Sequence, residues 1–268
     1  MCVASVADQK VGVEHIVQDA GSDDGTLEWL LKDNRVKAFV EKDRGMYDAI
    51  NRGLRRASGE IVAYLNCDEQ YLPGTLVRVI DFFQSNPEID MVFGDVVFVD
   101  VEGQYLQHRK MQTPLLYHTW TCHLSTLSCG TFFRRSLVQD EQSLFNPALR
   151  DAGDGDWMVR MLRRGVKMAT LGEFTSAFTC TGANMSAGPN ARRENRELFE
   201  TAPLLARKLK PLLVLHHRMR RLLGGMYIQH PFDYEVFTVK SPERRQRFHV
   251  DRPRGIYKLE ASRDLAGR

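Results

Sequence analysis

The sequence predicts an α/β fold, in which the strands of a sheet alternate with crossover helices. Short apolar runs rich in Val and Ile alternate with helical patterns through the first two thirds of the chain. Residues 201–232 contain no Asp or Glu and are typical of a basic amphipathic helical segment. The residues that follow alternate like a strand pair. We therefore expect a sheet flanked by helices, followed by a basic helical segment and a short β-type tail.

The predicted elements of the first part follow one another in regular order, strand before helix. The predicted strands are residues 13–19, 36–42, 59–66 and 90–100. The predicted helices are residues 26–34, 46–57 and 74–86. Pro87 helps to end the last of these helices, because a residue before proline avoids the helical conformation.

The chain is predicted to divide into three parts. Residues 1–200 form the sheet domain, residues 201–232 the basic helical segment, and residues 233–268 the tail. The basic segment is expected to break near Pro211 and to end at Gly224 and Gly225. The tail is expected to pair two strands around Ser241 and Pro242.

Composition favours an ordinary globular protein. Hydrophobic residues at 43% and charged residues at 26% exclude a disordered class, and a net charge of +3 does not call for nucleic acid as a partner. The five cysteines include no C-x-x-C pair, which argues against a disulfide framework or a zinc knuckle. No apolar run reaches 18 residues, and the first residues lack the apolar core of a signal peptide. We therefore expect a cytoplasmic protein.

Three carboxylate sites lie at or near predicted strands, where ligands of open α/β sheets bind. They are Asp19, the pair Asp68 and Glu69, and Asp95. For Asp19 a second interpretation stands beside ligand binding, because the surrounding "AGSDDGT" is rich in turn formers and Asp19 then serves as a cap or turn residue.

The adjacent carboxylates Asp68 and Glu69 follow the apolar strand "EIVAYLNC" directly. Two neighbouring carboxylates repel each other unless a cation or hydrogen-bond donors lie between them. Hard oxygen ligands suit Mg2+ or Mn2+, and such a cation neutralises the charge of a departing diphosphate. Alternatively, the two residues are an ordinary acidic pair on the surface.

Four blocks in one order carry a resemblance to a known family. These blocks are "QDAGSDDGT", "EKDRGMYDAINRG", "ASGEIVAYLNCDEQYLPG" and "DAGDGDWMVRMLRRG". From about Ser5 to Asn184 the chain resembles glycosyltransferase family 2, whose members have the GT-A fold. The resemblance implies an inverting transfer of a sugar from a nucleotide-diphosphate donor to an acceptor hydroxyl, assisted by Mg2+ or Mn2+. It also implies a glycan or a lipid-linked molecule as acceptor and a role in polysaccharide biosynthesis.

The resemblance also implies which residues bind the donor. Asp19 matches the acidic residue that contacts the nucleotide base, and Asp43, Arg44 and Gly45 lie where the family lines the donor pocket.

Two further acidic blocks have implied roles. Asp68 and Glu69 match the D-x-D-type element, with Asp68 near the donor ribose or the metal and Glu69 as a metal ligand. Glu69 departs from the usual Asp. Asp154 matches the catalytic base that precedes the D-x-x-x-R helix.

Asp154 also makes chemical sense as the base, because an inverting transfer needs a carboxylate to take the proton of the acceptor hydroxyl. The second interpretation is a helix cap, since a helix is expected to begin near Gly155 or Asp156. Asp156 would then lie in the first turn and pair with Arg160 four residues later.

The remaining candidates have simpler interpretations. His108, His118 and His123 lack the spacing of helical metal ligands, and His216 and His217 are interpreted as solvated or packing residues. The leucines of residues 201–232 suit packing, while the basic residues suit peripheral contact with an anionic membrane.

Compared with the family, this sequence is expected to start inside the first helix and to lack the opening strand, because "SVADQ" at Ser5 to Gln9 matches the end of that helix. We expect the natural chain to extend upstream by roughly 20 to 30 residues, the length of a strand, a loop and most of a helix. The rival interpretations are an inactive nucleotide- or glycan-binding remnant and a nucleotidyltransferase. A nucleotidyltransferase would carry a glycine-rich activation loop with Lys or Arg, and this sequence shows none at its start.

Overall fold

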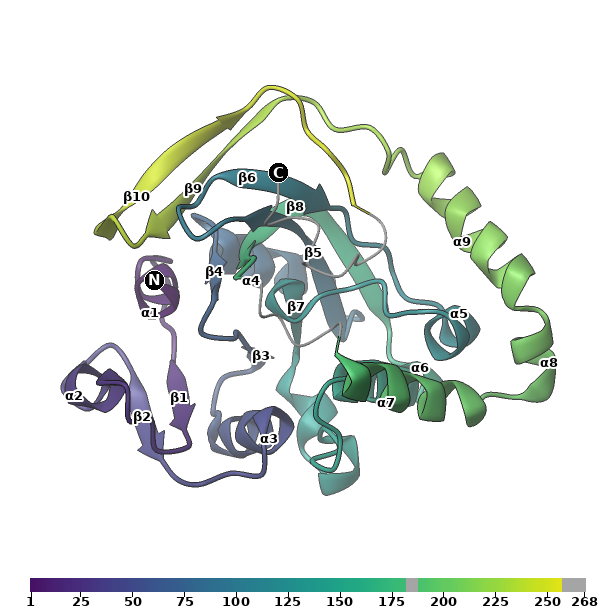
Figure 1. The fold of residues 1–268 in the computed structure, drawn as a ribbon, viewed down its shortest axis with the longest axis horizontal. Helices are drawn as coiled ribbons and strands as arrows, with labels where there is room; N and C mark the ends of the chain where they lie inside the picture. Colours follow the sequence, from purple (N-terminus) through teal and green to yellow (C-terminus); the bar gives the residue numbers. More distant parts are fainter. Residues whose placement is uncertain (182–187, 257–268) are drawn as a thin grey trace.

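The computed structural model describes residues 1–181 and 188–256 and confirms the predicted α/β fold (Figure 1). A curled central sheet of mixed direction lies between helices, and a hairpin covers one end of it. Asn184, where the resemblance ends, and the last twelve residues of the predicted tail lie outside the described residues.

The central sheet has the strand order β3-β7-β5-β8-β4. β6 also pairs with β5, along a later part of that strand than β7 does. Only β5 and β8 run parallel, and the other neighbours are antiparallel. The strands are β3 (Ile61–Ala63), β4 (Glu69–Tyr71), β5 (Met91–Val99), β6 (Tyr105–Arg109), β7 (Thr131–Arg134) and β8 (Met168–Thr179). All nine residues of β5 are buried, because the strand has neighbours on both edges and packed layers on both faces.

A separate two-stranded sheet precedes the central one. β1 (Ile16–Asp19) pairs in parallel with β2 (Lys37–Val40), and the short α2 (Thr26–Leu30) connects them. The sequence places these strands in regular succession with β3, but β3 pairs only with β7 among the described residues. Figure 1 shows β1, β2 and α2 as a lobe beside the central sheet.

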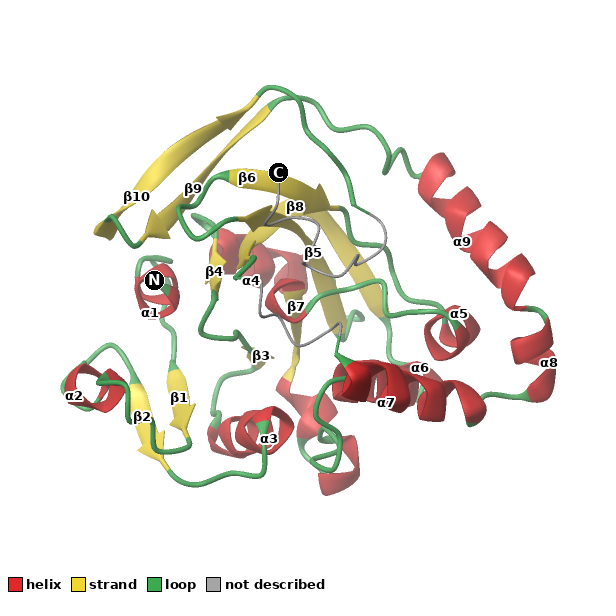
Figure 2. Cartoon of the chain, in the orientation of Figure 1, coloured by secondary structure: helices red, strands yellow, loops and turns green. Residues whose placement is uncertain are grey.

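Helices cover both faces of the central sheet (Figure 2). α3 (Met46–Arg56) and α6 (Gly153–Arg163) pack on one face, where Tyr47, Leu54, Trp157 and Met161 share a core with residues of β5 and β7. α4 (Thr75–Ser85) packs on the other face with α1 (Cys2–Ala7), in a core that includes Phe83. α5 (Leu116–Thr121) and a 3-10 turn (Ser128–Gly130) connect β6 to β7, and two further 3-10 turns (Arg135–Val138 and Glu141–Ser143) follow β7.

The basic segment folds as predicted into helices. α7 (Pro189–Glu200) precedes it, and α8 (Leu204–Lys208) and α9 (Lys210–Leu223) form it. The break falls at Leu209, and Pro211 occupies the first turn of α9, where its missing N–H costs no hydrogen bond. Within the described residues, no helix has both the length and the apolar character needed to cross a bilayer.

The predicted strand pair is confirmed as a hairpin of β9 (Phe232–Thr238) and β10 (Ser241–Val250). It packs on the central sheet, since Tyr234 and Val236 share a core with residues of β5. The side-chain amide of Gln70 exchanges two hydrogen bonds with the backbone of Phe237, at 2.9 Å each. The division into three parts stays a prediction, but the hairpin lies directly on the sheet.

Candidate active site

Asp19 lies at the carboxyl end of β1 and organises the turn that follows. One carboxylate oxygen accepts the backbone N–H groups of Gly21 and Ser22, both at 2.7 Å, and the other accepts the Ser22 hydroxyl at 2.8 Å. Burial raises the pKa of Asp19, but these hydrogen bonds outweigh it and the pKa lies below its ordinary value. Asp19 therefore acts as the turn residue of the second interpretation, and its ionised carboxylate remains at a strand end, where a ligand would bind.

The second predicted donor block follows β2, the parallel neighbour of β1. Asp43 accepts the N–H of Gly45 at 2.9 Å, and Gly45 adopts φ of 125°, which side chains rarely tolerate. Arg44 is exposed and directs its backbone N–H to Asp48. The buried Asp48 carboxylate also pairs with Arg52 at 3.0 Å and so fixes the start of α3. Asp48 was missed by sequence reasoning, because its spacing marks only a first-turn helix acid.

The acidic pair divides between the surface and the interior. Asp68 is half-buried, and burial raises its pKa. Glu69 begins β4, is fully buried and accepts hydrogen bonds from the Asn66 N–H at 2.8 Å and the Ser128 hydroxyl at 2.7 Å. Burial raises the pKa of Glu69 to about 7, against these donors. Neither of these two donors is a cation, so a bound metal ion is a chemically suitable complement to Glu69.

Asp95 does not lie at the end of a strand, contrary to the sequence interpretation. It lies within β5, is buried, and accepts the Met111 N–H at 2.7 Å. Burial raises its pKa to about 6. Asp95 therefore fixes the connection that follows β6.

Asp154 lies in the first turn of α6, which begins at Gly153, two or three residues before the predicted start. Its side chain accepts the Gly155 N–H at 2.9 Å and lies 3.4 Å from the Tyr47 hydroxyl. Burial raises its pKa. A side chain at position 153 would lie 2.5 Å from the Tyr47 ring, so only glycine permits this close approach. The predicted pairing of Asp156 with Arg160 is confirmed at 2.9 Å.

Asp154 lines a small cavity of about 10 Å³, and the cavity also contains a side chain that holds Glu69. Asp154 and Ser128 both line this cavity, and Ser128 donates its hydroxyl to Glu69. Tyr47, which contacts Asp154, directly follows the start of α3 and hence the donor block at Asp43. Asp154 therefore contacts the first turn of α3 through Tyr47 and shares a cavity with the serine that holds Glu69.

Glu194 of α7 is a positioning residue that sequence reasoning missed. Its buried carboxylate accepts the N–H groups of Arg150, Asp151 and Ala152, at 3.0, 2.9 and 2.9 Å. Burial raises the pKa of Glu194, but these N–H groups and Asn190 outweigh it, and the pKa is lowered overall. The carboxylate holds the chain just before α6, so it positions Asp154 from a helix 40 residues away.

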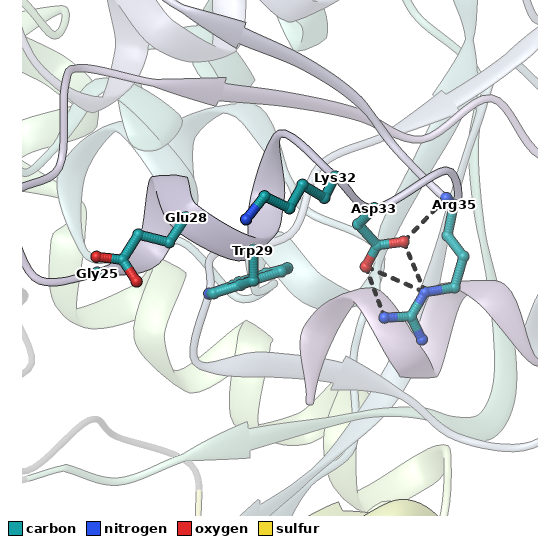
Figure 3. A pocket seen from close by; sticks show the side chains of 6 residues that line it. All are labelled: Gly25, Glu28, Trp29, Lys32, Asp33 and Arg35. Carbon is teal, nitrogen blue, oxygen red and sulfur yellow. Dashed lines mark hydrogen bonds and ion pairs between the residues drawn. The ribbon is translucent and has the colours of Figure 1, made fainter.

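A further depression on the surface contains none of these residues. It is an open depression of about 530 Å³ beside α2, lined by Trp29, Lys32 and the ion pair of Asp33 with Arg35 (Figure 3).

Solved structures of glycosyltransferases share this fold. TarS from S. aureus, solved in complex with UDP, superposes with a TM-score of 0.57 at 18% identity, over 83% of this chain and 67% of that chain. The mannosyltransferase PcManGT from Pyrobaculum calidifontis, solved with GDP-Man and Mn2+, gives a TM-score of 0.50 at 18% identity, over 82% of this chain and 64% of that chain. The fold is therefore GT-A-like.

The sequence comparisons define the family. The family model for glycosyl transferase family 2 matches residues 1–141, more than half of the chain, and the chain belongs to that family. A PGL/p-HBAD biosynthesis glycosyltransferase of Mycobacterium tuberculosis is 30% identical over 59% of this chain. The chain spans 62% of the length of that relative. The uncharacterized glycosyltransferase YwdF of Bacillus subtilis is 26% identical over 67% of this chain and 68% of its own length.

We expect Glu194→Gln to destabilise the protein by about 1 to 3 kcal/mol, because buried backbone N–H groups lose an anionic acceptor. Urea unfolding at pH 7 measures this, with Glu197→Gln on the exposed side of the same helix as the matched control. The pKa of Glu194 is lowered by folding, so its contribution is present above about pH 4.3 and is lost as the pH falls through the folded pKa. A stability difference that persists undiminished at pH 3 would contradict the assignment.

Proposed function

We propose that this chain transfers a sugar from a nucleotide-diphosphate donor to an acceptor hydroxyl with inversion of configuration. The observation that carries the proposal is the position of Asp154, which shares a cavity with the residue that supports Glu69. Membership of glycosyl transferase family 2 supports the same reaction class. An inverting transfer requires a base on the acceptor side of the sugar, and Asp154 supplies that carboxylate in this proposal.

The donor nucleotide would lie at the carboxyl ends of β1 and β2. These strands are parallel, and the backbone of Glu41 donates to the carbonyl of Asp19 at 2.9 Å, so both strands end at the same edge. Asp19 would contact the base, and Asp43, Arg44 and Gly45 would line the pocket. TarS was solved with UDP-GlcNAc and PcManGT with GDP-Man, which supports a nucleotide sugar as the class of donor without choosing the nucleotide.

Asp68 and Glu69 would hold Mg2+ or Mn2+ together with the donor. When bound, the cation would neutralise the charge that develops on the departing diphosphate. Asp68 is the more accessible of the two carboxylates, whereas Glu69 would keep its hydrogen bonds and use a remaining lone pair.

Asp154 would act on the acceptor. Its carboxylate takes the proton of the acceptor hydroxyl while that oxygen forms a bond to the anomeric carbon of the sugar. The bond from the anomeric carbon to the diphosphate oxygen breaks, and the electron pair leaves with the nucleoside diphosphate. Tyr47 and the Gly155 N–H hold the carboxylate at the mouth of α6 during this step.

We also infer a location at the inner face of the cell membrane, with the acceptor drawn from a polysaccharide pathway. The five cysteines are free in the structure, which agrees with a cytoplasmic location. α8 and α9 lie at the edge of the molecule (Figure 1). They expose apolar side chains between basic ones in the sequence. The largest exposed fractions belong to Leu204, Leu205, Leu212, Leu215, Leu222 and Leu223, at 56 to 81%.

An anionic membrane suits both the apolar and the basic side chains of this surface. A buried leucine side chain is worth about 1.5 to 3 kcal/mol and each basic residue near an anionic surface about 1 kcal/mol. The leucines therefore supply more of the expected binding than the charges do. Residues 201–232 contain no acid that would oppose contact with anionic lipid.

Asp154→Asn is expected to lower kcat by a factor on the order of 10² to 10⁴ while donor binding and folding stay nearly unchanged. Asp156→Asn is the matched control and should cost about 1 kcal/mol of stability or less, with activity kept, because it loses only the half-exposed pair with Arg160. Turnover and donor affinity of both variants measure the difference. Since burial raises the pKa of Asp154, kcat should fall with decreasing pH at a pH above the ordinary value for Asp of about 3.9. An inactive but stable Asp156→Asn beside an active Asp154→Asn would place the base two residues later.

Donor binding is expected to need a divalent cation and to weaken in Glu69→Gln and Asp68→Asn, because each variant removes a negative oxygen ligand. Calorimetric titration of nucleoside diphosphate, with Mn2+ or with EDTA, measures this. Gln at position 69 keeps the side-chain length, so the hydrogen bond from Ser128 can persist. Equal affinities in EDTA and in both variants would remove the metal from the proposal.

Binding to vesicles that contain phosphatidylserine is expected at low salt and is expected to weaken in the triple variant Leu212→Gln, Leu215→Gln, Leu222→Gln. The exposed Val239→Gln on the hairpin is the matched control, because it removes a similarly exposed apolar side chain from another surface. Liposome flotation measures both. If the unmodified protein does not float with vesicles at low salt, these helices have another use.

A further inference from the structure

Three histidines that are far apart in the sequence meet between α5 and α9. They are His118 on α5, His123 after it, and His217 on α9, and their ring nitrogens lie within 4.8 Å of one another. His118 and His217 are buried, whereas His123 is half-buried. Sequence reasoning separated these residues, because neither their spacing nor a motif indicates that α9 returns to α5.

A buried arginine, Arg221, adjoins the histidines, and a second one, Arg109, lies near Arg221. Arg109, at the end of β6, is 1% exposed and Arg221 on α9 is 2% exposed. Arg109 donates one N–H to the carbonyl of Leu124 at 3.2 Å, while its Nε finds no acceptor among the described residues. Burial and the charge of Arg221 lower the pKa of Arg109 to about 10, so it stays a cation at neutral pH. Two cations are thus buried near each other.

The histidines extend this set of donors. Burial and the charge of Arg221 lower the pKa of His118 to about 4. Burial, then His118 and Arg221, lower the pKa of His217 to about 3. Both rings are therefore neutral at pH 7, and the Nε2 atoms of both have no hydrogen-bond partner among the described residues. These neutral imidazoles can donate an N–H to an incoming acceptor.

Among the described residues, no carboxylate neutralises the charge of Arg109 or pairs with His118 or His217. None of these three side chains forms an ion pair with an acid in the described part of the chain. A buried cation without a counter-ion is costly, and so is a buried polar nitrogen without a partner. An anion with several acceptor oxygens would satisfy both needs, and arginine is well suited to bind one.

A metal ion fits the same cluster poorly. A metal held by an imidazole lies near the plane of the ring, at about 2.0 to 2.1 Å from the nitrogen for Zn2+. The rings of His118 and His217 lie face to face, with centroids 3.9 Å apart and planes 12° apart, so one ion cannot lie in both planes. The neighbouring Arg221 would also repel a dication.

We propose that Arg109, Arg221, His118 and His217 form a binding site for a phosphate group of the acceptor. The location supports the acceptor over the donor. Leu124, whose carbonyl accepts from Arg109, lines the cavity of Asp154, and His123 directly precedes it. An acceptor anchored here by a phosphate would present a hydroxyl toward Asp154. The identification of the ligand as the acceptor rests on the proposed transferase function, whereas the binding of an oxyanion at this site does not.

The test is a calorimetric titration of inorganic phosphate into the whole protein, without sugar donor. Phosphate is expected to bind, and Arg109→Met and Arg221→Met are each expected to weaken it by about tenfold or more, as for a lost charge-assisted hydrogen bond. Arg218→Met is the matched control, because it removes the same charge from the exposed side of α9 and should leave the affinity within about twofold. Circular dichroism confirms folding of each variant, and the two arginine variants serve as independent tests.

Three further results decide the assignment. Phosphate binding that persists in the presence of saturating nucleoside diphosphate supports a separate acceptor site, whereas competition between them assigns the cluster to the donor and overturns it. Absence of phosphate binding at millimolar concentration overturns it as well. Tight binding of Zn2+ that is lost in His118→Ala would show a metal site instead. Nucleoside diphosphate that fails to bind in the same titrations would reject the proposed transferase function while leaving the phosphate result interpretable.

Discussion

The burial of β5 is the constraint on which the rest of the structure depends. Its side chains enter all three cores, with Met91 and Phe93 in the core beneath α3 and α6, Val92 in the core beneath α4, and Val97 and Val99 beneath the hairpin. A strand buried on every side must be covered on both faces and paired on both edges. The hairpin therefore completes the core, and the connection after β6, which is tied to β5 through Asp95, leads to α5 at a fixed position.

Backbone N–H groups hold most carboxylates of the candidate site in place. Asp19, Asp43, Asp154 and Glu194 each accept at least one of them, so the orientation of each carboxylate follows from the path of the chain. Such donors favour the ionised form, whereas burial opposes it, and the balance differs from site to site. Hydrogen bonds prevail at Asp19, and burial prevails at Asp154. A base with a raised pKa binds a proton more strongly, which suits its proposed role.

The fold was more predictable than the site, for physical reasons. Periodicity predicted the helix at residues 46–57 almost to the residue, since a strongly amphipathic helix carries its signal locally. The start of α6 was predicted two or three residues too late, and the close approach of Gly153 to Tyr47, 106 residues earlier, leaves no local signal in the sequence. The motif blocks located Asp19, Asp68 and Asp154, but the roles assigned to them stay predictions. Glu194 and the histidine cluster could not be predicted, because long-range packing alone brings these side chains together.

The charges around the candidate site are separated in a way that one reaction can explain. On one side Glu69 is fully buried and accepts hydrogen bonds from the neutral Asn66 N–H and Ser128 hydroxyl, and it suits a cation. On the other side Arg109 is buried beside Arg221, and this pair suits an anion. Like charges gathered in a low-dielectric interior destabilise the folded protein, so a bound ligand of opposite charge would stabilise each group. Asp154 lies between the two, bordering the cavity that Ser128 and Leu124 also line. Two substrates that both carry phosphate would repel each other in water. A protein that neutralises one through a cation and the other through arginine removes that repulsion before the hydroxyl meets the sugar.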